Sequence, residues 1–212
     1  MKSLKVPRLN DIAPGDVEEL HSALDKEKRH SLEFLLWENG SDERPEVSFS
    51  IAHCNRYVLL KFFIEEKEIR ANVTKINGAV WEDSCVEFFV SFDESGYYNF
   101  EFNCIGTVLG AFRKNRNDRI HLPEDILNKI ETHTKLNKRN DFFYWEMLIV
   151  IPIELFFYHA LQSLSGVECR GNFYKCGDGL SQPHYLAWAK IEADKPNFHL
   201  PQFFGNIKFE QG

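Results

Sequence analysis

Residues 80–90 and 97–103 carry carboxylate and amide side chains that alternate with aromatic ones. Glu87 follows Trp81 in the first stretch, and Asn103 follows Glu101 in the second. Carboxylates and amides exchange hydrogen bonds with hydroxyl groups, and aromatic rings cover apolar surface. Together these residue types suit a polyhydroxylated ligand such as a sugar. The alternative interpretation is the ordinary solvated face of a half-exposed antiparallel sheet.

The two stretches predict a β-hairpin. The segment Asp93-Glu94-Ser95-Gly96 separates them, and a three-residue loop over 94–96 gives Gly96 the left-handed position of a bulged turn. In this register the apolar face pairs Val86 with Cys104, Phe88 with Phe102, Val90 with Phe100 and Phe92 with Tyr98. The opposite face carries Glu87, Phe89 and Ser91 opposite Asn103, Glu101 and Asn99.

Two carboxylates on one face of a hairpin also permit catalysis. Glu87 and Glu101 are expected in diagonal positions, with Cα atoms roughly 7 to 8 Å apart. Retaining glycosidases place their two carboxyl groups about 5 to 5.5 Å apart, and inverting ones about 6.5 to 9.5 Å. A nearby Lys175 or Arg170 would lower the pKa that a general acid needs to have raised. A glycoside hydrolase is therefore the alternative function, and a salt-bridged face is the alternative to both.

The elements that must position these residues are mostly short strands. Besides the hairpin, strands are predicted over 31–37, 47–53, 57–65, 107–113, 142–151, 167–176, 184–191 and 206–209. Short strands separated by turn residues indicate a sandwich rather than alternating strand and helix units. Residues 58–64 and 145–151 are apolar on both faces, which suits central strands of packed sheets.

Three helical segments are predicted. Asp16 is expected to cap a short helix with Val17, Leu20 and Leu24 along it. Pro123 is expected to open a helix over 124–137, and Pro152 another over 153–164.

The expected fold class is therefore all-β. It is a two-sheet antiparallel β-sandwich, jelly-roll-like or immunoglobulin-like, with one or two short helical insertions and a single domain over residues 1–212. With 212 residues, 43% of them hydrophobic and 14% aromatic, the chain can bury a substantial core.

Net charge argues against nucleic acid as a partner, and the lack of a long apolar stretch argues against a membrane. The 25 Lys and Arg are outnumbered by 32 Asp and Glu, for a net charge of −7. The basic run over 113–119 lacks interleaved aromatic residues and is expected to form a solvated loop between a strand and a helix. Nucleic acid is therefore excluded as a partner. No stretch approaches the roughly 18 apolar residues of a membrane span, so no membrane partner is expected.

The cysteines and the first residues bear on compartment. Five cysteines are an odd number, and their spacing forms no disulfide framework. No Cys-x-x-Cys pair is present and the histidines are scattered, which argues against zinc. Residues 1–8 lack an apolar segment behind their charges. The chain as given is expected to be cytoplasmic, or extracellular or periplasmic if a signal was removed.

Four motifs follow one another along the chain. They are Trp81-x-x-Ser-x-Val-Glu87, then Asn99-Phe-Glu-Phe-Asn103-x-x-Gly106, then Gly171-Asn-Phe-Tyr174 with Trp188 after it, and finally Phe198-x-x-Pro-x-x-Phe-Gly-x-Ile-x-Phe209. Their order, over roughly residues 45 to 210, resembles family 9 carbohydrate-binding modules. These modules bind cellulose and xylan, are associated with endo-xylanases and have a DOMON-like β-sandwich. The resemblance implies the same sandwich here.

The resemblance also implies a ligand and a site. In the family two aromatic side chains sandwich a sugar ring at the reducing end of a glucan or xylan chain, while polar side chains bond its hydroxyls. Trp81 matches the first aromatic, and Phe198 falls where the second, usually a Trp, stands. Glu87 and Asn103 match polar residues that contact the sugar. The partner implied is the end of an oligosaccharide or polysaccharide.

Two positions depart from the family. Glu101 replaces a basic ligand-binding residue and Lys175 replaces an amide. A Glu101–Lys175 pair would restore the charge balance, or the ligand differs from plain glucan. A sandwich repurposed for a non-sugar ligand therefore stays open.

The remaining tryptophans and a metal complete the expectations. Trp37 and Trp145 are assigned to the core, and Trp188 is left open between core and site. Calcium is a structural ion in the family, but no Asp-x-Asp-x-Asp loop assigns its oxygen ligands here, and no cofactor is expected. The sequence indicates no oligomeric state.

Overall fold

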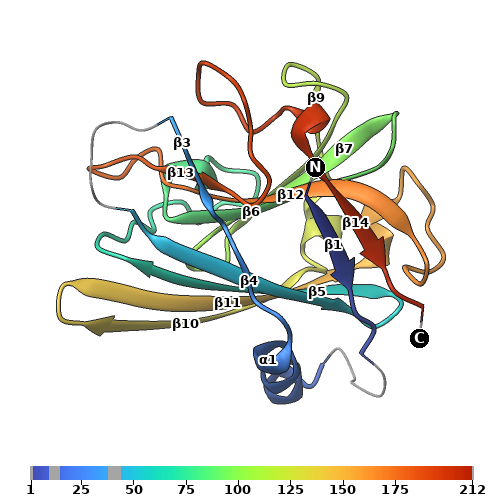
Figure 1. Cartoon of the computed structure of the whole chain (residues 1–212), viewed down its shortest axis with the longest axis horizontal. Helices are drawn as coiled ribbons and strands as arrows, with labels where there is room; N and C mark the ends of the chain where they lie inside the picture. Colours follow the sequence, from blue (N-terminus) through green and yellow to red (C-terminus); the bar gives the residue numbers. More distant parts are fainter. Residues whose placement is uncertain (1, 10–14, 38–43, 212) are drawn as a thin grey trace.

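Two β-sheets pack face to face in the computed structural model, which describes residues 2–9, 15–37 and 44–211 (Figure 1). The larger sheet runs in the order β1 (Ser3–Val6), β14 (Gly205–Phe209), β12 (Glu168–Cys176), β6 (Cys85–Asp93), β7 (Gly96–Asn103), β8 (Val108–Arg113) and β9 (Arg119–His121), with β13 (Tyr185–Ala187) on β12 and β3 (Phe34–Leu36) on β13. The smaller sheet runs β10 (Glu131–Arg139), β11 (Phe142–Pro152), β5 (Tyr57–Glu66), β4 (Glu46–His53) and β2 (His30–Ser31).

Antiparallel pairing dominates both sheets. Among the described strands, only β1 and β14 pair in parallel. The predicted all-β antiparallel sandwich is confirmed. The strands β5 and β11, which are apolar on both faces, are indeed interior strands of the smaller sheet.

Aromatic side chains fill the space between the sheets. The ring of Phe173 on β12 stacks on Phe49 of β4, with centroids 3.9 Å apart, and on Phe88 of β6 at 5.0 Å. The edge of Trp188 meets Phe173 at 5.7 Å, so Trp188 belongs to this core. Burying each such ring is worth roughly 1.5 to 3 kcal/mol before the entropy cost of folding.

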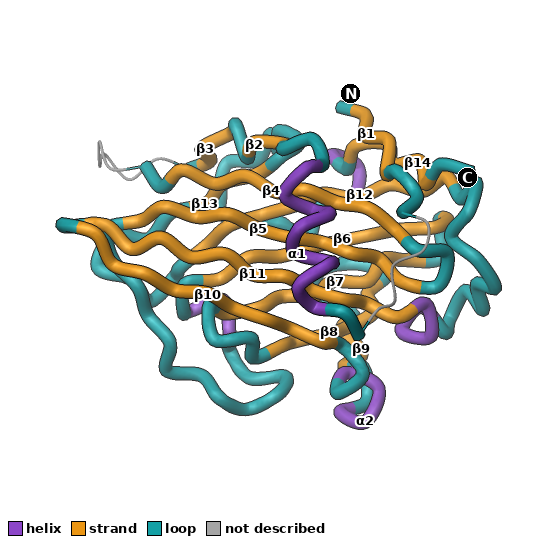
Figure 2. Tube along the Cα trace, turned by 90° about the horizontal axis from the view of Figure 1, so that it is seen from below, coloured by secondary structure: helices purple, strands orange, loops and turns teal. Residues whose placement is uncertain are grey.

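The helix α1 (Val17–Lys26) covers the outer face of the smaller sheet (Figure 2). As predicted, Asp16 caps it, because the Asp16 side chain accepts a hydrogen bond of 3.0 Å from the Glu19 amide. Leu20 and Leu24 are fully buried in a small apolar cluster with Leu59 and residues of β11. This packing explains why β5 is apolar on both faces.

The helix predicted over 124–137 is wrong. Helix α2 covers only Glu124–Leu127, and β10 then begins at Glu131 and pairs with β11 along its whole length. β10 is an edge strand with mostly exposed, polar side chains, so it lacks the apolar alternation that marks a strand in sequence. Pairing with β11 satisfies its backbone groups and outweighs local preference.

The helix predicted over 153–164 is also wrong. A 3₁₀ helix, η2 (Ile153–Phe156), follows Pro152 and ends after one turn. Ile153, Leu155 and Phe156 are buried in the core between the sheets. Ala160 has a φ of 45°, outside the right-handed helical region, so a helix cannot continue to residue 164.

The hairpin of β6 and β7 forms, but its register differs by two residues from the prediction. Glu87 lies directly opposite Glu101, and Val86 opposite Phe102. The turn is tighter than expected: Asp93 pairs with Gly96, and an irregularity between Val90 and Asp93 takes up the extra residues. A shift of two residues preserves the alternation, so every side chain keeps its predicted face.

Polar contacts explain the tight turn. The Asp93 carboxylate accepts a 2.8 Å hydrogen bond from the Ser95 amide, and the Ser91 hydroxyl lies 2.7 Å from the carbonyl oxygens of both Asp93 and Gly96. Gly96 is required because a Cβ there would lie 2.4 Å from the Arg113 carbonyl oxygen.

Candidate functional site

The outer face of the larger sheet, away from the smaller sheet, holds a pocket of about 400 Å³. Its floor consists of strand residues from β6, β7 and β12, namely Glu87, Glu101 and Cys176. Two loops rise above this face, one between β8 and β9 and one before the 3₁₀ helix η3 (Pro201–Phe203) (Figure 1). The lining from loops and strand ends is Trp37, Trp81, Arg113, Arg116, Asn117, Arg119, Asp178, Tyr185, Pro196, Asn197, Phe198 and His199.

One wall of the pocket is a fixed aromatic group. Phe198 stacks on Tyr174 with centroids 4.1 Å apart and planes 6° apart, and the Tyr174 hydroxyl donates to the Phe198 carbonyl oxygen at 3.3 Å. The ring of Trp37 lies 5.9 Å from Phe198, and its indole N–H donates to the Ala193 carbonyl oxygen at 2.6 Å. Trp37 is thus a wall of the pocket, which corrects its assignment to the core.

Trp81 supplies the aromatic group of another wall. It lies in the 3₁₀ helix η1 (Val80–Glu82), and its carbonyl oxygen accepts a 3.0 Å hydrogen bond from the Asp178 amide. The Trp81 side chain is half-buried. In the described part of the chain its ring contacts neither Phe198 nor Trp37, so these aromatic groups border a shared space rather than packing on each other.

The floor contains two buried carboxyl groups. Glu87 is 3% exposed and Glu101 is 4% exposed. The Cys176 thiol donates to Glu87 Oε1 at 3.0 Å, and the Asn99 amide donates to Glu101 Oε1 at 2.8 Å. Burial raises the pKa of Glu87 well above its usual range, and it raises the pKa of Glu101 to about 7 against the opposing influence of Arg113.

The basic run over 113–119 takes part in this pocket, and its residues 114–119 are exposed, as expected for a solvated loop. The expectation that the run leads from a strand to a helix is wrong. The run connects the two strands β8 and β9. Arg113 is 5% exposed, its Nε donates to Asn99 Oδ1 at 3.0 Å, and one of its terminal nitrogens donates to the Arg116 carbonyl oxygen at 2.7 Å. Because Arg113 pairs with Tyr97 across β7, it shares a face with Glu101. The alternation of side chains along the two strands is the sequence signal that could have placed Arg113 on this face.

Asn103 lies outside the pocket lining. Its amide nitrogen donates to the Val73 carbonyl oxygen at 2.7 Å and to Asp83 Oδ2 at 2.9 Å, and its oxygen accepts from the Thr107 amide at 2.9 Å. Burial alone would raise the pKa of Asp83, but hydrogen bonds from Val73, Asn72 and Asn103 outweigh it and lower the pKa. Asn103 thus anchors the loops beside the pocket.

Lys175 lies on the opposite face of β12, toward the space between the sheets. Its ammonium is 2.8 Å from Glu66 Oε2 and 2.8 Å from His184 Nε2. The expected Glu101–Lys175 pair is therefore not formed. Tyr174 pairs with Glu87, so strand alternation directs the neighbouring Lys175 away from the pocket.

The structure thus gathers four of the six predicted site residues, which are Trp81, Glu87, Glu101 and Phe198. Trp145 lies in the core, as expected, and its indole N–H donates to Glu66 Oε1 at 2.7 Å.

Within the described residues, one group of side chains could hold a metal ion: Cys85, Glu87 and Cys176. Two of its three ligand atoms are sulfur, whereas calcium takes oxygen ligands, so this group does not fit calcium. The two cysteines lie directly opposite each other on β6 and β12. Burial raises the pKa of Cys85 to about 12, so its thiol is protonated at neutral pH.

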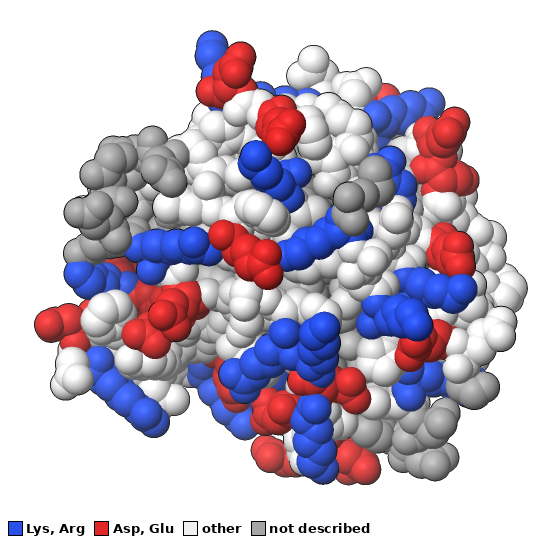
Figure 3. Space-filling model, in the orientation of Figure 1, with Lys and Arg blue, Asp and Glu red and all other residues white. Residues whose placement is uncertain are grey.

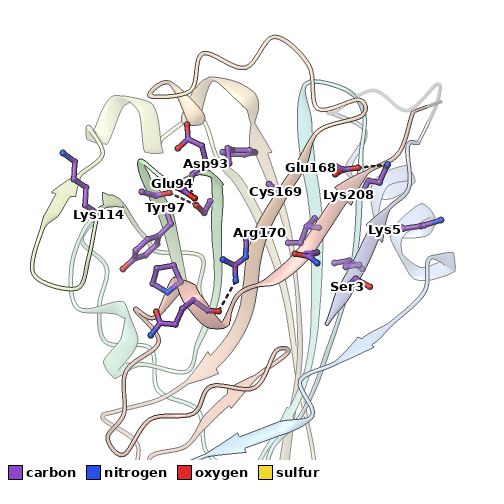
Figure 4. Close-up of a pocket in the computed structure, with 18 residues that line it drawn as sticks. Ser3, Lys5, Asp93, Glu94, Tyr97, Lys114, Glu168, Cys169, Arg170 and Lys208 are labelled. Carbon is purple, nitrogen blue, oxygen red and sulfur yellow. Dashed lines mark hydrogen bonds and ion pairs between the residues drawn. The ribbon is translucent and has the colours of Figure 1, made fainter. Parts of the chain in front are cut away.

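A second hollow of about 790 Å³ lies beside β1, β12 and β14 (Figure 4). Three of its charged groups are already engaged: Lys208 forms a 2.7 Å ion pair with Glu168, and Arg170 donates to the carbonyl oxygens of Gln202 and Phe204 at 3.0 Å each. None of the predicted site residues lines it. On the face shown in Figure 3, charges of both signs are interspersed, which matches the absence of a basic stripe in the sequence.

Comparisons with known proteins indicate a family of carbohydrate-binding proteins. The model of carbohydrate-binding family 9 matches residues 18–209. The crystal structure of a candidate carbohydrate-binding protein from Bacteroides uniformis is 39% identical, with a TM-score of 0.91 over 99% of both chains. No curated protein matches the sequence.

Two further structures show the same fold at low identity. They are of a family 9 carbohydrate-binding module from Caldicellulosiruptor kristjanssonii, one in complex with glucose and one with cellotriose. They are 14% and 13% identical to this chain, cover all of it and 97% and 95% of their own chains, and give TM-scores of 0.64 and 0.65. Within the described residues no helix has the length and apolar character that crossing a membrane requires.

Proposed function

The chain belongs to carbohydrate-binding family 9, and on that premise we propose that the pocket above β6 and β7 binds the end of an oligosaccharide. The observation that carries the proposal is the arrangement of Trp81 and Phe198 around a floor that holds Glu87 and Glu101. The volume of about 400 Å³ lies within the usual range for small-molecule sites.

The aromatic walls suit the apolar faces of a sugar ring. A pyranose presents C–H groups above and below its plane, and stacking them on indole or phenyl rings removes apolar area from water. The stacking of Phe198 on Tyr174 and the hydrogen bond from Trp37 to Ala193 hold this wall in place before a ligand arrives. A preorganised wall lowers the entropy cost of binding.

The floor suits the hydroxyl groups of the same ring. A protonated carboxyl donates one hydrogen bond and accepts others, so Glu87 can exchange hydrogen bonds with a hydroxyl without a buried negative charge. Two loops and the sheet bound the pocket. A bounded pocket favours the end of a chain, because the middle of a glucan or xylan chain needs a groove open on two sides.

The same carboxyl groups do not favour a hydrolase. A glycosidase needs one carboxyl protonated and the other held ionised as nucleophile or base. Burial raises the pKa of both Glu87 and Glu101, and neither forms an ion pair among the described residues. The comparisons contain no finding that supports catalysis.

Titration calorimetry with cello-oligosaccharides and xylo-oligosaccharides, before and after borohydride reduction of their ends, tests the proposal. We expect saturable binding to the wild type, weaker binding after reduction, and at least about tenfold weaker binding to Trp81→Ala. Tyr158→Ala, an exposed aromatic outside the pocket, is the control and should bind as the wild type does. No binding to any glycan, or unchanged binding to Trp81→Ala, would refute the proposal.

A further inference from the structure

Three guanidinium groups line the pocket on one side. They belong to Arg113, Arg116 and Arg119, at the two ends and in the middle of the β8–β9 connection. None of the three forms an ion pair with a carboxylate within the part of the chain that the structure describes. Arg116 and Arg119 are exposed to solvent, so their guanidinium groups can bind an anionic group of a ligand.

The carboxyl groups of the pocket do not supply the opposite charge. Glu87 and Glu101 lie at the buried floor, where burial favours their protonated forms. The Asp178 carboxyl forms a hydrogen bond with the hydroxyl of Tyr185, and burial raises the pKa of Asp178 as well. Near neutral pH these groups therefore neutralise the arginines only in part.

His199 shows that the three guanidinium groups act on the same space. It lines the pocket, its ring stacks on Phe89 with centroids 5.1 Å apart, and its Nδ1 lies 3.1 Å from the Tyr97 hydroxyl. Burial and the positive charges of Arg113, Arg116 and Arg119 lower the pKa of His199 to about 3. The histidine is neutral, so it does not add to the positive charge of this side.

The loop that carries these arginines is ordered by its own hydrogen bonds. The Arg113 side chain donates to the Arg116 carbonyl oxygen at 2.7 Å, and the Asn117 amide donates to Asn115 Oδ1 at 2.9 Å. The arginines are therefore presented by a closed turn, and a ligand need not order the loop itself.

We propose that the pocket selects a sugar whose ring carries a carboxylate, as a uronic acid does, with Arg116 and Arg119 binding that carboxylate while the ring lies between the aromatic walls. This inference rests on the proposed carbohydrate binding and specifies its ligand. Guanidinium matches the planar geometry of a carboxylate with two parallel hydrogen bonds, which favours a uronic acid over a neutral sugar. Arg113, which is nine-tenths buried and hydrogen-bonded to Asn99, adds positive potential to the pocket from its buried side.

Calorimetry of D-glucuronate, D-galacturonate, glucose 6-sulfate and D-glucose against the wild type and Arg116→Gln/Arg119→Gln tests the proposal. We expect a uronate to bind the wild type at least about tenfold tighter than glucose does, and the ratio of these two affinities to fall close to one in the double variant. Raising the salt concentration should weaken uronate binding only. Lys114→Gln, which removes a charge from the same loop outside this pocket, is the control.

The outcomes separate the two proposals. If glucose or neutral oligosaccharides bind and the uronates gain nothing, the anionic ligand is wrong and the carbohydrate site stands. If glucose 6-sulfate binds tightly and the uronates do not, the carboxylate is the wrong group. If no neutral sugar and no uronate binds, the proposed function itself fails.

Discussion

The ammonium of Lys175 and the carboxylate of Glu66 form a 2.8 Å ion pair between the two sheets, where Lys175 is completely buried and Glu66 is 3% exposed. Lys175 also donates to the Cys176 carbonyl oxygen at 3.0 Å and lies 2.8 Å from His184 Nε2, while Glu66 accepts from Trp145 at 2.7 Å. Burial and the Lys175 charge hold the pKa of His184 far below its usual value, so this histidine accepts the hydrogen bond. The pair is therefore supported from both sheets.

Removing one partner of this pair is predicted to destabilise the protein strongly. Lys175→Met leaves the Glu66 carboxylate buried without a counterion, which costs about 3 to 5 kcal/mol. The double variant Lys175→Met/Glu66→Gln should recover most of that loss, since the amide oxygen of the introduced glutamine can still accept from Trp145. Denaturant unfolding of the wild type, the two single variants and the double variant measures these losses in free energy of unfolding. A loss in the double variant equal to the sum of the two single losses would contradict the prediction.

Stability is predicted to fall as pH rises from about 4.5 to about 7 because of Glu101. Its pKa is raised from 4.5 to about 7 in the folded protein, so the folded state binds more protons than the unfolded state in that window. One pKa unit corresponds to about 1.4 kcal/mol, so the rise from 4.5 to about 7 sets an upper limit of roughly 3.5 kcal/mol. Glu101 faces Glu87, Asn99, Arg113, Arg119 and Asp178.

Melting temperatures of the wild type and Glu101→Gln across pH 4 to 8 check this. The variant cannot titrate at position 101, so its melting temperature should depend less on pH in the window, with the larger gain over wild type at pH 8. Parallel curves for the two proteins would show that Glu101 does not titrate there.

Gly96→Ala is predicted to destabilise the hairpin that carries Glu87 and Glu101. Its Cβ would lie 2.4 Å from the Arg113 carbonyl oxygen and 2.6 Å from the ring of Phe112, and a backbone atom cannot move aside cheaply. We expect a loss of at least about 1 kcal/mol. Gly15→Ala, where no atom lies within 4 Å of the added Cβ, should stay within about 0.5 kcal/mol of wild type. Equal unfolding midpoints for the two variants would contradict this account.

Substitutions of Trp188 and Trp37 are predicted to have opposite effects: the first lowers stability and the second lowers glycan affinity. Trp188→Ala opens a cavity against Phe49 and Phe173, with a loss of about 3 to 5 kcal/mol, but leaves glycan affinity unchanged. Trp37→Ala removes a pocket wall and weakens glycan binding with a smaller effect on stability, because the Trp37 side chain is only partly buried. Calorimetry together with thermal unfolding separates the two. Glycan binding lost in a folded Trp188→Ala variant would place Trp188 at the site instead.

The alternation of side chains was the most robust sequence signal. It placed Glu87 and Glu101 on one face of the hairpin even though the register is shifted by two residues, because alternation survives an even shift. The irregularity between Val90 and Asp93 could not be read from sequence, since the Ser91 and Asp93 side chains that stabilise it could equally serve a longer loop.

Tertiary pairing determined what the sequence could not show. β10 is polar and mostly exposed, and only the presence of β11 beside it makes it a strand. The arginines at 113, 116 and 119 belong to the pocket because their loop folds back over the sheet, which a run of charges does not reveal. The position of Lys175 differs from the expected pair with Glu101 because the face that its side chain occupies depends on the pairing of β12 with β6. These two strands lie far apart in the chain.

The parallel pairing of β1 with β14 has a mechanical consequence. Ser3 pairs with Asn206 and Val6 with Phe209, and further hydrogen bonds of 2.9 Å join Asn206 to Lys2 and Glu210 to Val6 (Figure 1). A force that pulls residue 2 away from residue 211 loads these bonds in shear, so they must break together, whereas a hairpin pulled at its open end unzips one bond at a time. The fold thus resists tension along the chain at this pair of strands, and stretching a single molecule should show one abrupt rupture there before the sheets separate.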